Sequence, residues 1–152
     1  MRWTAVLAAL LLAAAVAPAA DEPPLPEVAA ALQRIAGRST IEITTTGRRS
    51  GQEHTNPVWF VVTDGKILLQ AGKDGQTDWY QNLKKNPAVV LRQGDYTFRG
   101  RAVPVDDPRR EEEIHQFFRH KYTRAWLASL FNSSIGAGRP VEVTPISVAV
   151  RR

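Results

Sequence analysis

The chain has 152 residues and no cysteine, with 43% hydrophobic and 23% charged residues. These values are ordinary for a soluble globular protein, and they exclude a wholly disordered chain, a multi-span membrane protein and a disulfide-stabilised fold. The formal net charge of +5 favours anionic ligands, and the length that remains after a leader segment suits one domain.

The N-terminus has the pattern of a secretory signal peptide. Arg2 precedes an uncharged apolar run, Trp3 to Val16, which closes on the small residues Ala17-Pro18-Ala19. This tripeptide fits a signal-peptidase site, so we predict a signal peptide over residues 1–19, in preference to an uncleaved membrane anchor. The run is short for a membrane span. We therefore expect an exported protein, periplasmic or extracellular, with no stable membrane span after cleavage.

A linker and a short helix are expected next. The proline-rich residues 20–26 have the composition of an extended linker, and we expect one folded domain over residues 27–152. Apolar residues recur at helical spacing from Pro26 to Arg34, and Gly37 is placed to end that helix.

Strands dominate the middle of the chain. The β-branched run Thr40 to Thr46 and the run Thr55 to Thr63 predict two strands separated by a tight polar loop. Asp64-Gly65 predicts a type I′ hairpin turn, with Lys66 to Ala71 as the antiparallel partner.

A second helix separates this group from another strand pair. Thr77 or Asp78 can cap a short helix that ends before Asn86-Pro87. The pair that follows is predicted over Ala88 to Gln93 and Tyr96 to Val105, joined at Gly94-Asp95.

A longer helix and a last strand complete the domain. Asp107-Pro108 predicts a helix start, and helical character is expected to reach Leu130. We expect a loop from Asn132 to Pro140 and a strand from Val141 to Val150, with an edge or bulge at Pro145. One apolar helix face is predicted, made of Ile114, Phe117, Phe118 and Tyr122. Five or six hairpin-connected strands favour a mainly β fold with inserted helices, closed into a small barrel.

The segment Thr44 to Gly51 carries the clearest chemical pattern. It places Arg48, Arg49, several hydroxyl groups and the backbone of Gly47 in one turn. Guanidinium and backbone N–H donors in a tight turn suit phosphate oxygens, although two solvated arginines in an ordinary turn would have the same sequence.

Further motifs follow this loop in a fixed order. They are Asn56-Pro57-Val58-Trp59-Phe60, Asp64-Gly65, Gly72-Lys73-Asp74-Gly75, Trp79-Tyr80-Gln81-Asn82-Leu83 and Asn86-Pro87. Together with Thr-Thr-Gly-Arg-Arg-Ser-Gly, this ordered set resembles the deazaflavin-dependent nitroreductase family, a branch of the flavin-binding split β-barrels related to pyridoxamine 5′-phosphate oxidases. The resemblance covers Thr40 to Val105 well and the C-terminal third weakly.

The resemblance implies a split β-barrel of about six strands that binds coenzyme F420. It implies that Arg48, Arg49 and Ser50 hold the phosphate and acidic tail, with His54 standing where a basic arginine is common. Asn56, Pro57 and Trp59 would lie along the ring system. Gly72, Lys73 and Asp74 would approach from the next loop. Trp79 and Asn82 match positions near the cofactor, with a core tryptophan and a helix-surface amide as the simpler interpretations.

The activity implied is hydride transfer from reduced F420 to a quinone, a nitroaromatic or a related small electron acceptor. The cofactor carries the hydride chemistry, so no catalytic residue is assigned beyond Tyr122, a match to a substrate-pocket tyrosine. Ala125 and Ala128 stand where further tyrosines are expected, so substrate preference does not carry over. Related barrels often pair as homodimers, which stays open here.

Export leaves a second hypothesis open, because F420 in this family is re-reduced by cytosolic dehydrogenases. The alternative is an exported, non-catalytic binder of a flavin such as FMN, a tetrapyrrole such as haem, or a lipid-like ligand on the same barrel. A metal centre is not expected, since three histidines and one Glu112–His115 pair are better explained by a solvated helix. Nucleic-acid binding is not expected either, because basic residues are spread along the chain among acids.

Overall fold

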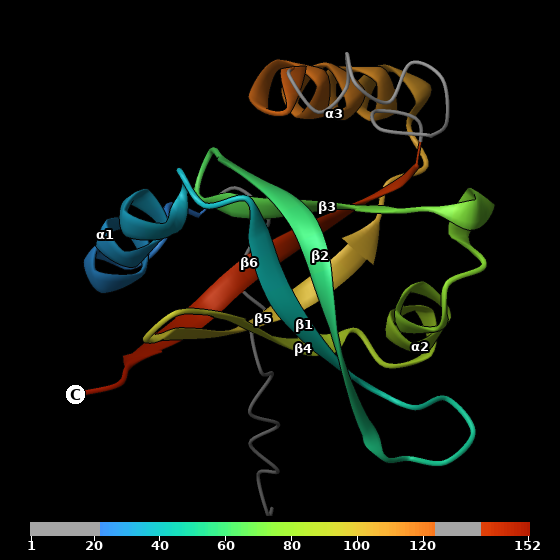
Figure 1. Cartoon of the computed structure of the whole chain (residues 1–152), viewed down its shortest axis with the longest axis horizontal. Helices are drawn as coiled ribbons and strands as arrows, with labels where there is room; N and C mark the ends of the chain where they lie inside the picture. Colours follow the sequence, from blue (N-terminus) through green and yellow to red (C-terminus); the bar gives the residue numbers. More distant parts are fainter. Residues whose placement is uncertain (1–21, 124–137) are drawn as a thin grey trace, which may run out of the picture.

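The computed structural model describes residues 22–123 and 138–152. Its strands form one closed antiparallel barrel in the order β1-β2-β3-β6-β5-β4 (Figure 1). The strands are β1 (Thr40–Thr46), β2 (Glu53–Thr63), β3 (Lys66–Ala71), β4 (Ala88–Gln93), β5 (Tyr96–Pro104) and β6 (Arg139–Val150). The helices are α1 (Pro26–Ile35), the 3-10 turn η1 (Lys73–Gly75), α2 (Asp78–Lys85) and α3 (Pro108–Lys121). The predicted fold class, mainly β with inserted helices around a six-strand barrel, is confirmed.

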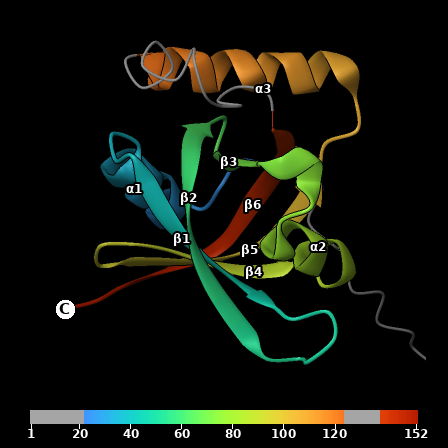
Figure 2. The ribbon, with the colours of Figure 1, turned by 45° about the vertical axis from the view of Figure 1, so that its right-hand side comes forward.

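Hairpin chemistry fixes the order of the first three strands. Asp64 and Gly65 both have positive φ, 51° and 72°, as the predicted type I′ turn requires. β2 begins at Glu53 rather than at the predicted Thr55, because β1 keeps pairing with it as far as Thr46 opposite Glu53. β1 and the first half of β2 thus form a long arm that projects beyond β3 (Figure 2).

The last strand also begins earlier than predicted. Pro140 pairs with Gln70 of β3, so the end of the expected loop from Asn132 to Pro140 belongs to β6. Pro145 stands opposite Gly100 at a register shift, which confirms the predicted bulge. The expected helical stretch beyond Thr123 and the loop up to residue 137 lie outside the described residues.

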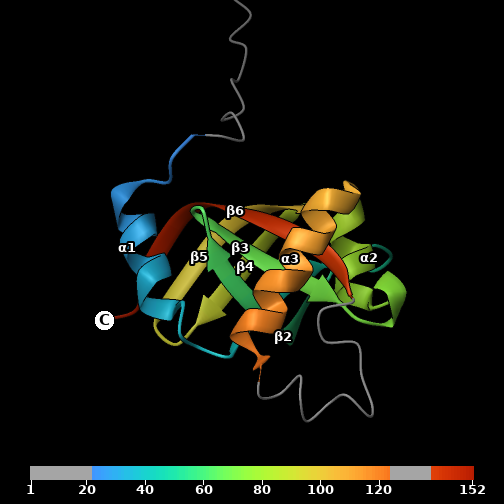
Figure 3. The same ribbon diagram turned by 90° about the horizontal axis from the view of Figure 1, so that it is seen from above.

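The barrel interior and its helical cover make two apolar clusters. The inner cluster fills the barrel and continues under α1 and α2; its largest fully buried residues include Phe60, Phe98, Leu69 and Leu91. A smaller outer cluster joins α3 to β2 and β3 through Ile114, Phe118, Tyr122, Val61 and Leu68. Each such side chain contributes roughly 1.5–3 kcal/mol when fully buried. In Figure 3, α3 crosses over β2 and β6, while α1 lies at one end of the barrel.

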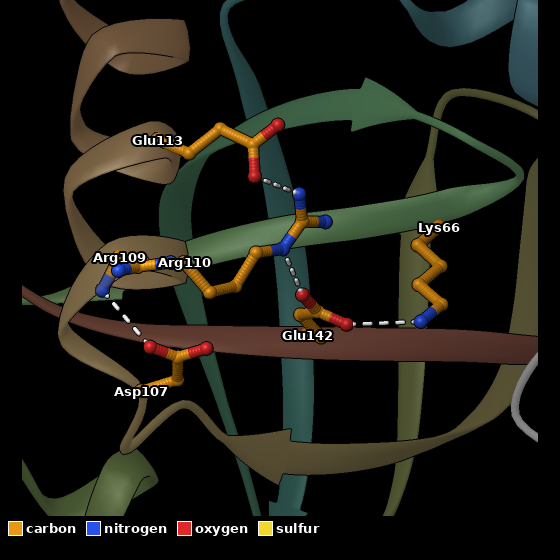
Figure 4. Close-up of polar contacts among 6 residues, drawn as sticks. All are labelled: Lys66, Asp107, Arg109, Arg110, Glu113 and Glu142. Atoms are coloured by element: carbon orange, nitrogen blue, oxygen red, sulfur yellow. Dashed lines mark hydrogen bonds and ion pairs between the residues drawn. The ribbon is translucent and has the colours of Figure 1, made fainter.

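Charged side chains fasten α3 to the barrel as well (Figure 4). Glu142 of β6 accepts hydrogen bonds from Arg110 Nε at 2.6 Å and from Lys66 Nζ at 3.0 Å. Arg110 also donates to Glu113 at 2.7 Å, and Asp107 caps the helix by accepting from the backbone N–H of Arg109 at 2.9 Å. Burial alone would raise the pKa of Glu142, but the hydrogen bonds from Arg110 and Lys66 outweigh it and lower that pKa.

No helix among the described residues is long and apolar enough to cross a membrane. The barrel, the arm and α2 together position the candidate site.

Candidate functional site

The loop between β1 and β2 forms two adjoining open hollows against α2. The larger, about 510 Å³, is lined by Thr46, Gly47, Arg48, Arg49, Ser50, Gly51, Lys85 and Asn86. The smaller, about 380 Å³, is lined by Gly47, Arg48, Arg49, Ser50, His54, Thr55, Asn56, Asp78 and Asn82. Gly47 to Ser50 belong to both linings, so the predicted anion-binding turn lies at the centre of the site.

A buried amide holds this turn in place. Asn82 of α2 is only 2% exposed. Its Oδ1 accepts from the backbone N–H of Arg48 at 3.1 Å and from Arg48 Nη1 at 3.0 Å, while its Nδ2 donates to Thr45 Oγ1 at 3.2 Å. The simple interpretation of Asn82 as a helix-surface amide is therefore wrong. Its side chain instead fixes both the backbone and the guanidinium of Arg48.

Two further residues of α2 act on Arg48. Asp78 Oδ1 accepts from Arg48 Nη1 at 3.1 Å, and Lys85 Nζ donates to the carbonyl oxygen of Arg48 at 2.7 Å. The sequence analysis missed Asp78 and Lys85 as site residues. Their spacing from Asn82, four residues before and three after, places all three on one helix face, and this spacing was the available signal.

The turn is compact because Gly47 allows a close backbone approach. A Cβ built on Gly47 would lie 2.6 Å from Ser50 Oγ and 3.1 Å from His54 Nε2. The Gly47 N–H donates to Gln52 O at 2.7 Å, and Gly51 N donates back to Gly47 O at 2.9 Å. A side chain at position 47 would force this hydrogen-bonded turn to open.

The free donors of the turn suit an anionic ligand. Arg49 is exposed, and no described residue forms a hydrogen bond or an ion pair with its side chain. Arg48 is held by Asp78 and Asn82 but keeps 31% of its side-chain surface exposed. Lys85 lines the same hollow. Among the residues that line the two hollows, Arg48, Arg49 and Lys85 are cationic and Asp78 is the single carboxylate, so the donor set fits phosphate or carboxylate oxygens.

The other predicted cofactor residues on β2 lie along the arm and its continuation. His54 and Asn56 line the smaller hollow, whereas Pro57 is exposed on the strand opposite Glu42. Trp59 lies outside the lining of both hollows and stacks on Tyr122, the residue that follows α3, with ring centroids 4.5 Å apart and an interplanar angle of 13°. β2 therefore connects the anion-binding turn to an aromatic wall.

The structure does not bring Gly72, Lys73 and Asp74 into the lining of either hollow. They belong to the turn that follows β3, where Lys73 and Asp74 have positive φ of 51° and 52°. Asp74 accepts a hydrogen bond from Arg139 Nε at 2.9 Å. Trp79 is buried in the main core, as its simpler interpretation predicts.

Tyr122 closes the end of α3 against β2 and is only 8% exposed. Its hydroxyl lies 2.8 Å from both Ser39 O and Phe60 O and accepts from Phe60 N at 3.0 Å. Burial raises the pKa of Tyr122 to about 12, although the hydrogen bond to Phe60 acts in the opposite direction. The ring, rather than the engaged hydroxyl, is the part that meets Trp59.

Among the described residues, no group of three or more histidine and acidic side chains could hold a metal ion. The prediction that His115 is a solvated side chain is wrong. It is 12% exposed and its Nε2 lies 2.9 Å from Gly138 O, so it joins α3 to the start of β6.

Comparison with known protein families identifies the family of this barrel. Residues 27–143 match the family model of the F420H2-dependent quinone reductases. The chain belongs to this family. The resemblance drawn from the ordered motifs is thus confirmed, and so is coenzyme F420 as the cofactor that the family uses.

Solved structures share the fold of this chain. This chain is 27% identical to an F420H2-dependent reductase, with a TM-score of 0.52 over 70% of this chain and 93% of that one. A conserved hypothetical protein from Mycobacterium tuberculosis is 21% identical, with a TM-score of 0.60 over 78% and 81%. A pyridoxamine 5′-phosphate oxidase-like protein from Listeria innocua shares the fold at 11% identity, with a TM-score of 0.59 over 82% and 97%. The chain is accordingly an oxidoreductase of the F420H2-dependent class.

Proposed function

We propose that this chain holds the phosphate and acidic tail of F420 in the turn between β1 and β2 and reduces a quinone or nitroaromatic with the reduced cofactor. The proposal rests on two neighbouring arginines, one with its guanidinium held in place and one with its guanidinium free. Arg48 is held by Asn82 and Asp78, while Arg49 beside it has no partner among the described residues. A held arginine gives orientation, and a free one gives donors that a ligand can satisfy.

The remaining roles follow the order of the residues on the arm. Ser50 and His54 would add hydroxyl and imidazole donors to the anionic end. Asn56, Pro57 and Trp59 would lie along the ring system, and Gly72, Lys73 and Asp74 would approach from the turn after β3. When bound, the reduced cofactor supplies the hydride. The protein then has to bind and orient the cofactor and the acceptor and to exclude water. Trp59 and Tyr122 would supply a flat wall for an aromatic acceptor.

A binding and turnover experiment tests this proposal. Purified protein should bind F420 in an equilibrium titration and should oxidise the reduced cofactor when a quinone is added. The double variant Arg48→Ala/Arg49→Ala should lose about a hundredfold in affinity, since two charge-assisted contacts disappear. A variant that binds F420 as tightly as the wild type would contradict the assigned turn. Co-purification of a flavin or haem that is not consumed would favour the non-catalytic carrier instead.

We also propose that the protein is exported after cleavage before Ala20. The support is the sequence pattern of Arg2, the apolar run up to Val16 and the tripeptide Ala17-Pro18-Ala19. Mass analysis of the protein isolated from its host should show a mature chain that begins at Ala20, in an extracytoplasmic fraction. An intact N-terminus in the cytoplasmic fraction would contradict export. Light scattering of the same sample measures whether the barrel pairs as a homodimer.

A further inference from the structure

The outer face of β5 displays two arginines without a counter-ion. Phe98 and Ala102 point into the barrel and are each 1% exposed. Arg99, Arg101 and Val103 alternate with them along the strand, so their side chains point to solvent. Within residues 22–123 and 138–152, no ion pair or hydrogen bond engages the guanidinium of Arg99 or Arg101.

The strands on both sides of β5 leave this positive charge uncompensated. Glu142 of β6 stands opposite Val103. Its carboxylate is already bound by Arg110 and Lys66. The two arginines themselves have only uncharged cross-strand neighbours, which are Ala88, Val90, Thr144 and Ser147.

The β-bulge in β6 adds an exposed isoleucine beside these arginines. The register shift between Arg99 and Gly100 leaves Ile146 as the extra residue of the bulge. Ile146 and Ser147 are both exposed, so two successive residues of β6 face solvent here. Ile146 keeps 55% of its surface exposed and Val103 keeps 51%. We call Arg99, Arg101, Val103 and Ile146 the basic face.

The position and size of the basic face limit what can bind to it. β5 is hydrogen-bonded to β4 and β6 along its two edges, so a peptide cannot add a strand there (Figure 1). The face extends roughly 13 Å along β5 and roughly 10 Å across two strands. It is thus several-fold smaller than the area of about 800 Å² that each partner buries in a stable protein interface. None of its residues lines either hollow, so it does not enclose a small ligand.

A lipid surface fits these features, because it needs neither a strand edge nor a large matching area. We propose that the basic face binds the surface of an anionic membrane. The guanidinium groups of Arg99 and Arg101 bind lipid phosphates. Val103 and Ile146 enter the boundary between the headgroups and the acyl chains. Binding is peripheral and salt-sensitive, since it depends on two exposed charges and two short apolar side chains.

This orientation brings the candidate site close to the membrane. Arg101 stands opposite Ala88, whose N–H donates to Asn86 Oδ1 at 3.3 Å. Asn86 lines the larger hollow. The turn between β1 and β2 would therefore lie near the headgroups, within reach of a lipid-soluble quinone. This consequence rests on the proposed function, whereas membrane binding itself does not.

Flotation with lipid vesicles tests the binding. Vesicles of phosphatidylcholine alone are compared with vesicles that also contain phosphatidylglycerol, and the full-length wild type should prefer the mixed vesicles. Arg99→Gln/Arg101→Gln should weaken that binding about twentyfold, since each basic residue near an anionic surface contributes roughly fivefold. Arg34→Gln/Arg109→Gln removes the same charge from exposed positions on α1 and α3 and should have a much smaller effect.

A fluorescent label shows which face meets the lipid. The chain has no cysteine, so Ile146→Cys creates a single attachment point for an environment-sensitive fluorophore. Its emission should shift to the blue on mixed vesicles. The same label at Gln116→Cys, an exposed position on α3, should not shift. Both labelled proteins contain the apolar run up to Val16, so the comparison separates the basic face from binding through that run.

Val103→Ser/Ile146→Ser should weaken vesicle binding by about tenfold or more with an unchanged unfolding midpoint, because both side chains are exposed. A wild type without preference for mixed vesicles would overturn the proposal and leave the face to an acidic protein. An unshifted label at Ile146→Cys would also overturn it. Light scattering that finds a wild-type dimer and a monomeric serine variant would assign the face to a second copy instead. None of these outcomes involves F420, so this proposal and the proposed function fail separately.

Discussion

Asn82 Oδ1 accepts both the backbone N–H and the guanidinium of Arg48, at 3.1 and 3.0 Å, from a position that is almost fully buried. One amide thereby couples the conformation of the turn to the direction of its arginine. Asn82→Leu should leave the Arg48 N–H and the Thr45 hydroxyl without this partner and destabilise the fold by about 1–3 kcal/mol. It should also weaken F420 binding by about tenfold. Denaturant unfolding and F420 titration measure the two effects.

Lys84→Gln provides the control for Asn82→Leu, because Lys84 is on the same helix, is exposed and lines neither hollow. It should leave the free energy of unfolding nearly unchanged. If Asn82→Leu bound F420 as tightly as this control, the coupling between Asn82 and Arg48 would have no functional consequence.

Arg49 gives the complementary prediction, since it has no structural partner among the described residues. Arg49→Gln should leave the melting temperature unchanged but weaken F420 binding by about tenfold. The salt dependence of that binding should become shallower, because one screened charge contact is gone. Arg109→Gln removes an equal charge outside the site and should change neither quantity. An unaltered salt dependence in Arg49→Gln would show that Arg49 does not meet the anion.

Gly47→Ala tests the shape of the turn rather than its charge. The added Cβ would collide with Ser50 Oγ at 2.6 Å and crowd His54 Nε2 at 3.1 Å, so the turn must open. We expect weaker F420 binding with all charges retained. Gly51 has a positive φ of 70° but open space around it, so Gly51→Asn, which tolerates that conformation, should bind F420 nearly normally. Equal affinities for the Gly47→Ala protein and wild type would contradict this account of the turn.

The Glu142 network predicts an acid-dependent loss of stability. Glu142→Gln keeps the shape but weakens the contacts with Arg110 and Lys66, and should destabilise the fold by about 2 kcal/mol at neutral pH. The folded-state pKa of Glu142 is lowered from 4.5, so its contribution is present above that pH and is lost as the pH falls through the folded value. Unfolding curves of both proteins should therefore converge below pH 4.5. A constant difference at all pH values would argue against the charged network.

Lys121 has the opposite pH dependence. Its pKa is lowered from 10.5 to about 8, so between these values the unfolded chain holds more protons than the folded one. The free energy of unfolding of the wild type should therefore rise across this window relative to Lys121→Met. At neutral pH the Met variant should be at least as stable as the wild type, because it buries no charge. Denaturant titrations at neutral and alkaline pH check this difference. If the free energies of unfolding of the two proteins changed equally with pH, Lys121 would not be desolvated in the folded state.

The fold was largely predictable because its signals are local. β-branched runs, Asp64-Gly65 and Asp107-Pro108 each specify a strand, a turn or a helix start within a few residues. Pairing across the arm extended β2 to Glu53, and pairing with β3 drew Arg139 and Pro140 into β6; such contacts between distant segments leave no local pattern.

The candidate site was predicted only in part, for the same reason. Arg48 and Arg49 are apparent in the turn itself. The roles of Asn82, Asp78 and Lys85 depend on α2 packing against β1, which brings residues about thirty to forty positions apart in the chain together.

The central claim is that the turn between β1 and β2 binds the anionic end of F420. An equilibrium titration of F420 into the full-length wild type and into Arg48→Ala/Arg49→Ala tests it most directly. We predict saturable binding by the wild type and a loss of about a hundredfold in the double variant, with both proteins folded. Absence of binding by the wild type, or equal affinity in the two proteins, would contradict the account.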